Sequence, residues 1–319
     1  MNKAVEPGEI LIACPNLSLD RTMGLDDIEI GRVHRTDKVD IRGGGKGANV
    51  GRALRCVDLD SHIVGYAGGN VGAAIVALIR REGLTVTPVA VAGEARSCLT
   101  ALARRAETTV FNEPGPLIQE PDFARLEEAI GARLEAARVF VCSGSLPPGS
   151  RPDSAARLIA RARNSGCITV CDTAGEFLRH AMSEAPDVIK PNLAEARAVL
   201  GTGEGEMIDD GYGALEQAAE AAEALLGLGP RAVVVTAGSA GAVLAHGSGI
   251  QIYPAARVEV VNPVGAGDSL VAGVAAGLAD GADLTAALRR GMAMAAASCE
   301  TVPAAWLDPA RADQLLETL

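Results

Sequence analysis

The sequence predicts an α/β fold, because short apolar runs recur from end to end and amphipathic, helix-like segments separate them. The apolar runs lie at residues 10–14, 61–65, 139–142, 168–171, 188–190 and 232–236. Helical periodicity is found at residues 123–136, 154–164 and 215–226. Continuous apolar strands that alternate with helices are typical of a parallel sheet covered on both faces. We therefore expect one domain over residues 1–319 with a mainly parallel sheet.

Two regions, at about residues 17–41 and 97–112, depart from this pattern. Polar and apolar residues alternate in 100–104 and 107–111 without helical periodicity, which predicts exposed antiparallel strands outside the main sheet. We interpret these strands as a small β lid. The stretch 201–213 is rich in glycine and acidic residues, and we expect it to be a surface loop.

Composition excludes several classes of function. The 319 residues carry a net charge of −11 without a basic stripe, so nucleic acid is not an expected partner. No stretch approaches the roughly 20 apolar residues that span a bilayer, and the first residues do not resemble a signal peptide, so we expect a cytoplasmic protein without a membrane partner. The seven cysteines are scattered and never form a Cys-x-x-Cys pair, which indicates reduced thiols.

The most informative segment is 262–269, Asn-Pro-Val-Gly-Ala-Gly-Asp-Ser. Its small residues form a turn that runs into an apolar helix, and the free N–H groups at a helix start attract anions. Asp268 would lie beside such an anion, where it can accept a proton from an attacking hydroxyl. The plainer alternative is that Asp268 only caps the helix.

A second glycine-rich turn, at residues 43–47, also precedes an expected helix. Lys46 is followed by Gly47 where a Walker A loop has Ser or Thr, so the turn is not a Walker A loop. Its glycines let a ligand approach the backbone, while Lys46 and Asn49 offer charge and hydrogen bonds. A purely structural glycine turn is the alternative.

Three further polar turns, at residues 143–149, 190–195 and 236–241, follow expected buried strands. The carboxyl ends of parallel strands meet at one edge of the sheet, where ligands bind, so their convergence favours a site there. Residues 65–72 partly match a dinucleotide-binding fingerprint. The acidic residue that should follow the glycines by about 20 residues is absent at that spacing, because Glu94 lies further on. Ser143 and Ser145 lack the Gly-x-Ser-x-Gly elbow of serine hydrolases.

Taken in order, these segments resemble the ribokinase-like, or PfkB, family of carbohydrate kinases, and within it the 1-phosphofructokinase and tagatose-6-phosphate kinase branch. The resemblance rests on residues 15–20, 43–50, 143–149, 190–195 and 262–269. It implies a three-layer α/β/α sandwich with a small β lid, and ATP and Mg²⁺ as cofactors. Lids of this kind often pair between subunits, which implies a homodimer through the lid.

The resemblance also implies roles for individual residues. Asp268 is similar to the catalytic base, and the amides of Gly265, Ala266 and Gly267 are similar to the anion hole. The positions that match sugar-binding residues are Asp20, Gly44, Gly45, Asn49 and Ser145. The positions that match the nucleotide side are Lys190, Asn192, Glu195, Thr236, Gly238 and Gly241, with Ala295 and Ser298 bordering the adenine. Asn192 and Glu195 resemble the pair that organises magnesium through water.

Within the branch, Lys46 and Arg96 are similar to the groups that grip a phosphate already on the acceptor. The implied acceptor is a hexose phosphate: fructose 1-phosphate, fructose 6-phosphate or tagatose 6-phosphate. The chain departs from the branch at Cys98, where Asn is usual, and at Pro263, where Thr is usual. Both departures bear on substrate identity more than on reaction type.

Two alternatives stay open. One is a kinase of an unphosphorylated sugar or nucleoside, although an aromatic content of 3% offers few stacking partners for a base. The other is a sugar-phosphate-binding regulator without catalysis, against which the intact Asp268 turn argues.

Overall fold

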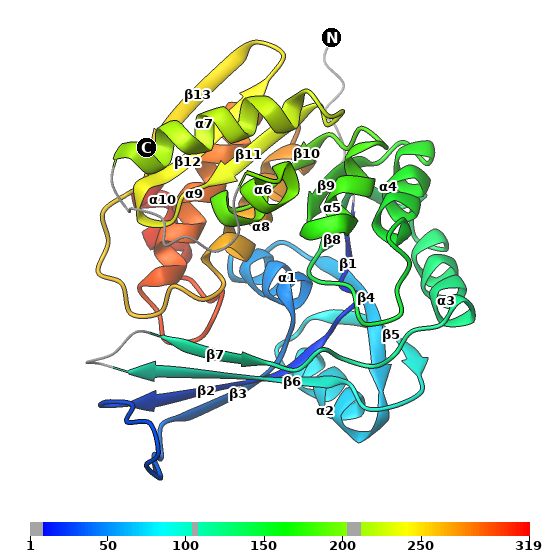
Figure 1. Cartoon of the computed structure of the whole chain (residues 1–319), viewed down its shortest axis with the longest axis vertical. Helices are drawn as coiled ribbons and strands as arrows, with labels where there is room; N and C mark the ends of the chain where they lie inside the picture. Colours follow the sequence, from blue (N-terminus) through cyan, green and yellow to red (C-terminus); the bar gives the residue numbers. More distant parts are fainter. Residues whose placement is uncertain (1–8, 104–107, 203–211) are drawn as a thin grey trace.

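The computed structural model describes residues 9–103, 108–202 and 212–319, and it contains two separate sheets (Figure 1). In this part of the chain nine strands form the main sheet, in the spatial order β13-β12-β11-β10-β9-β8-β1-β4-β5. Their bounds are β1 Glu9–Ala13, β4 Ser61–Gly68, β5 Thr85–Val91, β8 Ala137–Ser143, β9 Ile168–Asp172, β10 Val188–Ile189, β11 Ala232–Thr236, β12 Gly241–His246 and β13 Gly249–Pro254. The pairs from β5 to β11 are parallel, as predicted.

The other end of the sheet is antiparallel, which agrees with the prediction of a mainly parallel sheet but was not itself predicted. Strands β11, β12 and β13 pair in antiparallel fashion, with Val235 opposite Val243. The short turn between β12 and β13 leaves no room for a crossover helix, so the chain returns as a hairpin. Strands β12 and β13 therefore form an antiparallel edge of the sheet next to β11.

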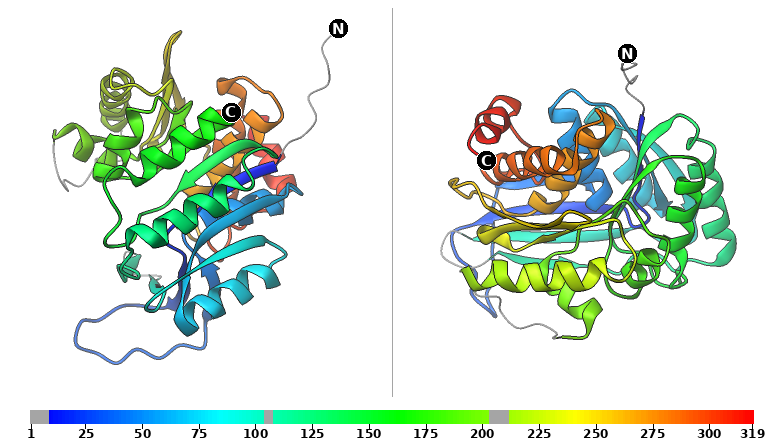
Figure 2. Two further views of the ribbon diagram at one scale, coloured as in Figure 1. Left: turned by 90° about the vertical axis from the view of Figure 1, so that its right-hand side faces the viewer. Right: turned by 90° about the horizontal axis from the view of Figure 1, so that it is seen from above.

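Helices cover both faces of the main sheet and give the predicted three layers (Figure 2). One face packs against α1 Lys46–Cys56, α2 Gly69–Arg81, α8 Ala266–Ala279, α9 Leu284–Cys299 and α10 Pro309–Leu316. The other packs against α3 Glu120–Gly131, α4 Ser154–Asn164, α5 Gly175–Met182, α6 Leu193–Leu200 and α7 Tyr212–Leu226. Helix α7 begins within the stretch expected as a surface loop, of which residues 203–211 lie outside the described part of the chain.

Helix α8 is buried around its whole circumference from Asp268 to Ala279. Its sequence is apolar on every side, which is typical of a helix enclosed in a core. It packs closely on α9: a Cβ atom built on Gly273 would lie 2.5 Å from the Cα atom of Gly291. Close packing excludes water from most of α8 beginning at Asp268, whereas Ala266 and Gly267 in the first turn stay half-exposed.

The second sheet has the order β3-β2-β6-β7 and comes from the two regions with alternating polarity. Its bounds are β2 Ser18–Leu25, β3 Val39–Gly44, β6 Arg96–Ala103 and β7 Thr109–Asn112. We call it the lid sheet; it projects from one edge of the main sheet (Figure 1). Most of its strand residues are half-buried or exposed.

The strand directions in the lid sheet correct the expectation of a purely antiparallel arrangement. Strands β2 and β6 pair in parallel, whereas β2–β3 and β6–β7 are antiparallel. The parallel pair has a topological cause: β2 follows β1 and β6 follows β5, and β1 and β5 end at the same edge of the parallel main sheet. The chain therefore leaves that edge twice in the same direction.

Two further observations concern the whole described chain. All seven cysteines are free thiols, and Cys14, Cys142, Cys167 and Cys171 are buried. No helix in the described ranges combines the length and the apolar character needed to cross a membrane.

Candidate active site

The first turns of α1 and α8 meet at the carboxyl edge of the main sheet. Each helix follows a glycine with positive φ: Gly45 at 101° and Gly265 at 87°. A side chain at Gly265 is also excluded by space, because a Cβ atom there would lie 2.7 Å from the backbone nitrogen of Ala305. Asn49 Nδ2 in α1 donates a hydrogen bond to Asp268 Oδ2 in α8 at 2.8 Å. The two glycine-rich turns therefore belong to one site.

Asp268 is almost wholly buried, with 7% of its surface exposed. Burial, followed by the negative charge of Asp172, raises its pKa to about 7, although Lys46, Asn49 and Lys190 oppose the shift. A carboxylate that titrates near neutral pH is suited to accept a proton from an alcohol. Its bond from another helix also distinguishes it from a residue that only caps α8.

Asp172 organises the positive charge of the site, and the sequence analysis missed it. It ends β9, is fully buried, and its Oδ1 lies 3.2 Å from Lys190 Nζ and 3.6 Å from Lys46 Nζ. Burial disfavours its charged form, but Lys190 and then Lys46 outweigh burial and lower its pKa. The available signal was an aspartate directly after a buried strand of the parallel sheet.

Lys46 and Lys190 lie on either side of this carboxylate. Lys46 Nζ also lies 3.3 Å from Glu195 Oε1, and its pKa is raised, chiefly by Asp172 and, against the effect of burial, by Glu195. A Cβ atom on Gly267 would lie 3.4 Å from Lys190 Nζ, so that ammonium group stands beside the small-residue turn of α8. Two cations thus face the start of α8.

Asp20 and the glycine-rich turn at residues 43–47 form another side of the site. Ser18 Oγ donates to Asp20 Oδ1 at 2.5 Å, and burial raises the Asp20 pKa despite this hydrogen bond. A Cβ atom on Gly44 would lie 1.9 Å from Asp20 Oδ2, so only glycine allows this approach. Gly45 contributes a backbone hydrogen bond to the same carboxylate.

Arg96 begins β6 at the base of the lid sheet. Its Nε donates to the backbone oxygen of Asn16 at 3.2 Å, and Asn16 Nδ2 donates to Ser145 Oγ at 3.1 Å. The Cβ atom of Lys46 lies 3.7 Å from the Cβ position of Gly144, next to Ser145. The turn after β8 therefore connects the surroundings of Arg96 and Lys46, although the Lys46 ammonium itself is directed to carboxylates.

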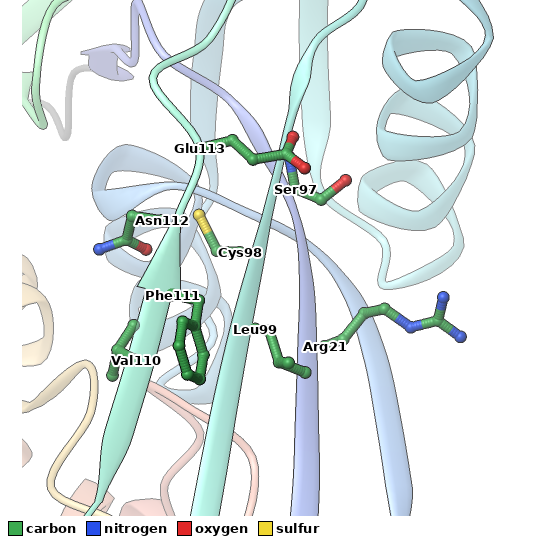
Figure 3. Close-up of a pocket in the computed structure, with 8 residues that line it drawn as sticks. All are labelled: Arg21, Ser97, Cys98, Leu99, Val110, Phe111, Asn112 and Glu113. Atoms are coloured by element: carbon green, nitrogen blue, oxygen red, sulfur yellow. The ribbon is translucent and has the colours of Figure 1, made fainter. Parts of the chain in front are cut away.

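The lid sheet also has a hollow along β6 and β7, about 430 Å³ in volume. Figure 3 shows its lining, in which Phe111 and Val110 of β7 lie beside Leu99 and Cys98 of β6. Arg21 of β2 lies at its border. The hollow borders the acceptor side of the site, because the thiol of Cys98 contacts Ser18 and is close enough to Arg96 and Asp20 for their charges to act on it.

The residues expected on the nucleotide side gather at the ends of β10 and β11. Asn192 caps α6: its Oδ1 accepts from the Glu195 amide at 2.7 Å, and Glu195 Oε2 accepts from the Asn192 amide at 2.9 Å. Asn192 also forms an isolated bridge with Thr236 at the end of β11. Gly238 and Gly241, with φ of 54° and 130°, shape the turn that follows. The capping box gives Asn192 and Glu195 a structural role in addition to any role toward metal.

The two α9 residues expected near the adenine, Ala295 and Ser298, carry no charge. Ser298 is buried and its hydroxyl donates to the Ala295 oxygen at 2.8 Å. Nearby, the Cys299 oxygen accepts from the Asn262 amide at 3.0 Å, which attaches the end of α9 to the segment before α8. Ala295 and Ser298 thus border that segment without a polar group directed at Asp268.

Asn262 braces the turn before α8, and the sequence analysis gave it no role. It is buried, its Oδ1 accepts from the Val264 amide at 3.0 Å, and its Nδ2 donates to the Val302 oxygen at 2.8 Å. The oxygen of Pro263 accepts from the Ala266 amide at 3.3 Å, so proline is accommodated in this turn.

The donor set fits magnesium only indirectly. Within the described residues no group of three or more His, Cys, Asp or Glu side chains has the arrangement of a metal site. Asn192 and Glu195 do offer hard oxygen donors, which Mg²⁺ prefers, but their cap and the Lys46 contact engage those oxygens. Contact through water and nucleotide phosphates is the mode that these residues fit.

A family model described as pfkB family carbohydrate kinase matches residues 16–307. Among solved structures, phosphofructokinase-2 from Escherichia coli in complex with fructose-6-phosphate is 26% identical, with a TM-score of 0.83 over 98% of this chain and 99% of that one. A Thermotoga maritima protein described as a possible 1-phosphofructokinase is 23% identical, with a TM-score of 0.83 over 97% of both chains. The ribokinase of Thermotoga maritima is 19% identical, with a TM-score of 0.73, and shares the fold over 97% of this chain and 99% of that one.

Proposed function

The chain belongs to the pfkB family of carbohydrate kinases, and from that premise we propose that it transfers the γ-phosphoryl group of ATP to a hydroxyl of a hexose phosphate. The acceptor in this proposal is fructose 1-phosphate, fructose 6-phosphate or tagatose 6-phosphate. The likeness to a phosphofructokinase-2 crystallised with fructose-6-phosphate supports this class of acceptor.

The observation that carries the proposal is the setting of Asp268. Its carboxylate is buried beside the small-residue turn of α8 and has a pKa of about 7. In the proposed reaction Asp268 accepts the proton of the acceptor hydroxyl, whose oxygen bonds to the γ-phosphorus as the bond to the ADP oxygen breaks. The amides of Gly265, Ala266 and Gly267 stabilise the transferring group through hydrogen bonds.

The surrounding charges divide the remaining tasks. Lys190, beside Gly267, neutralises the transferring phosphoryl, and the positioning of two anionic substrates supplies much of the rate, as is usual for phosphoryl transfer. Mg²⁺ bound with ATP would supply charge neutralisation on the phosphates, held through water by Asn192 and Glu195. Thr236, Gly238 and Gly241 form the nucleotide side, with Ala295 and Ser298 near the adenine.

Acceptor recognition is assigned to the other side of the site. Asp20, Gly44, Gly45, Asn49 and Ser145 hold the sugar hydroxyls in this proposal. Arg96 grips the phosphate already on the sugar, and Lys46 assists when that phosphate displaces its contacts with carboxylates.

The proposal includes a homodimer and a cytoplasmic location. In this proposal the lid sheet pairs with the lid of a second copy, because Phe111 of β7 and Ile30 of the connection between β2 and β3 are large, apolar and 60% and 103% exposed. Because its cosubstrate ATP is an intracellular metabolite, we place the protein in the cytoplasm.

One observation favours a second candidate. The Lys46 ammonium is 3.3 Å from Glu195 and 3.6 Å from Asp172, so it already has anionic partners. A kinase of an unphosphorylated sugar would leave those pairs undisturbed, and this reaction is the competing candidate.

An acceptor panel tests the proposal. The purified protein is supplied with MgATP and with fructose 1-phosphate, fructose 6-phosphate, tagatose 6-phosphate, fructose, ribose or adenosine, and ADP formation is followed with Asp268→Asn as the blank. We expect the highest kcat/KM with one of the hexose phosphates. A higher kcat/KM with a free sugar or nucleoside would replace the proposal with the second candidate.

A further inference from the structure

Arg52 is a buried arginine of α1 that the proposed mechanism does not use. Only 2% of it is exposed, although arginine is almost never fully buried unless it is paired. Its Nε lies 2.5 Å from Glu82 Oε2, so the buried cation is balanced by a carboxylate at the end of α2. Because Glu82 satisfies one side of the guanidinium, the remaining N–H groups are available for other contacts.

Those groups reach three segments that bound the site. Nη1 donates to Asn49 Oδ1 at 2.6 Å and lies 3.4 Å from the Ala304 oxygen, and Nη2 donates to the Gly43 oxygen at 2.7 Å. Gly43 is the first residue of the glycine turn at residues 43–47, and Ala304 is next to Ala305, which packs against Gly265. One guanidinium therefore contacts the glycine turn before α1, the Asn49 amide and the segment that packs against Gly265.

The contact with Asn49 determines which way its amide faces. An asparagine amide has an acceptor on one side and a donor on the other. Since Oδ1 accepts from Arg52, Nδ2 is the atom directed at Asp268 Oδ2, 2.8 Å away. The reversed amide would place oxygen against the Asp268 carboxylate and nitrogen against the guanidinium, so both contacts would become repulsive.

We propose that Arg52 is a positioning residue for phosphoryl transfer, which fixes the Asn49 amide so that its nitrogen holds the carboxylate of Asp268 in place for proton transfer. The inference rests on the proposed role of Asp268 as the base. Arg52 reaches Asp268 through Asn49 and touches no reacting atom.

Other charged groups face Asp268 and must be distinguished from this effect. They are Lys46 on α1, Asp172 at the end of β9, Lys190 after β10 and, as a weaker influence, the Cys14 thiol after β1. Arg52→Lys leaves these residues in place, but it also weakens the contacts with Gly43 and Ala304 and moves a charge that opposes the rise in the Asp20 pKa. The effect is therefore assigned to the Asn49 contact by its dependence on Asn49 in a double-mutant cycle.

The experiment is a double-mutant cycle between Arg52→Lys and Asn49→Ala, with kcat measured for the best acceptor of the hexose phosphate panel. Lysine keeps the charge beside Glu82 but lacks the planar fork that contacts Asn49 and Gly43 together. We expect Arg52→Lys alone to lower kcat about tenfold or more. We also expect the acidic limb of the pH profile of kcat to move to higher pH, because the hydrogen bond from Asn49 lowers the Asp268 pKa. In the Asn49→Ala background the same change should have less than a twofold effect, because the contact it removes is already absent.

Two controls keep the result interpretable. Arg55→Lys makes the same chemical change three residues along α1, where the partner is the exposed Asp58, and should leave kcat unchanged. If Arg52→Lys does not fold, the paired variant Arg52→Met with Glu82→Gln removes both buried charges at similar volume and takes its place in the cycle.

The outcomes separate the inference from the proposed function. Independent, multiplicative effects of the two substitutions, or wild-type kcat and pH profile in Arg52→Lys, would overturn the positioning role while Asp268→Asn stays inactive. Near-wild-type turnover in Asp268→Asn would instead overturn the assignment of the base, and with it this inference.

Discussion

The carboxyl edge of the main sheet and the lid sheet are neighbours in the fold, but their side chains are in opposite environments. At the edge, Asp172, Lys190 and Asp268 are buried and each interacts with another charged group. On the lid, Phe111 is 60% exposed and all four residues of β7 are exposed. Charges interact strongly where water is excluded and weakly where it is present.

This difference implies a division of labour. The buried edge carries preorganised charge for phosphoryl transfer, so substitutions there should change kcat. In the proposed function the lid sheet helps to recognise the acceptor and a second copy, so substitutions there should change KM or assembly.

Asp268→Asn should abolish the base without changing the volume of the buried edge. We expect kcat to fall by about 10² or more, the usual range for loss of a general base, while ATP and acceptor affinities stay nearly intact. Asp280→Asn, at the other end of α8, serves as the matched control because the Asp280 side chain is exposed and pairs with the half-buried Arg290. Steady-state kinetics measure kcat, and calorimetry measures the binding of ATP and of the acceptor. A variant with near-wild-type kcat would refute the role of Asp268 as the base.

Gly267→Ala should make the protein slower although more stable. Alanine favours a helix over glycine by about 1 kcal/mol, but its methyl group would occupy the space 3.4 Å from Lys190 Nζ where the transferring group is proposed to lie. We expect a loss of about tenfold in kcat together with a higher Tm.

Gly213→Ala in α7 is the comparison for this substitution. No atom would lie within 4 Å of its new Cβ, so it should raise Tm without changing kcat. Unchanged kcat in Gly267→Ala would remove Gly267 from the anion hole.

The pH dependence of kcat/KM reports the ionisation of groups in the free enzyme. Because burial and Asp172 raise the Asp268 pKa to about 7, the proposed base is increasingly protonated below that pH and would lose its ability to accept a proton. We expect kcat/KM to fall about tenfold per pH unit below about pH 6.5, and the residual activity of Asp268→Asn to lack this acidic limb. A profile that is flat down to pH 5 would place the base in a different environment from the one described.

The lid is expected to respond in assembly rather than in chemistry. Phe111→Glu puts a charge on an exposed apolar side chain of β7 and should shift the protein from dimer to monomer in sedimentation or light scattering. The acceptor KM should rise a few-fold, and kcat should change less. Leu228→Glu is the matched control, since Leu228 is 50% exposed but lies away from the lid. Equal assembly of the two variants would argue against pairing through the lid.

Much of the fold could be predicted because its pattern is local. Apolar runs bounded by turns gave most strands of the main sheet and the helix Ser154–Asn164, and glycine turns located the two helix starts at Gly45 and Gly265. The antiparallel hairpin of β12 and β13 and the parallel pair of β2 and β6 were not predicted, because pairing direction depends on where distant segments leave the main sheet.

The residues missed at the site share a different cause. Asp172, Arg52 and Asn262 act through partners that are distant in the sequence: Asp172 contacts Lys46, Arg52 contacts Ala304, and Asn262 contacts Val302. A sequence motif marks residues by their neighbours along the chain, so these contacts are visible only once the chain has folded. Arg52 had one local signal, its position three residues after Asn49 on the same face of a helix.

The measurement that tests the division of labour most directly is acceptor selectivity in Arg96→Ala. Charge-assisted hydrogen bonds from Arg96 to an acceptor phosphate would contribute roughly 1.5–3 kcal/mol, so we expect the ratio of kcat/KM for the best hexose phosphate to that for fructose to fall by about 10-fold to 150-fold. The KM for ATP should stay unchanged, and Arg21→Ala on β2 of the same sheet should keep the wild-type ratio. A wild-type ratio in Arg96→Ala, or an equal loss with both acceptors, would contradict the account.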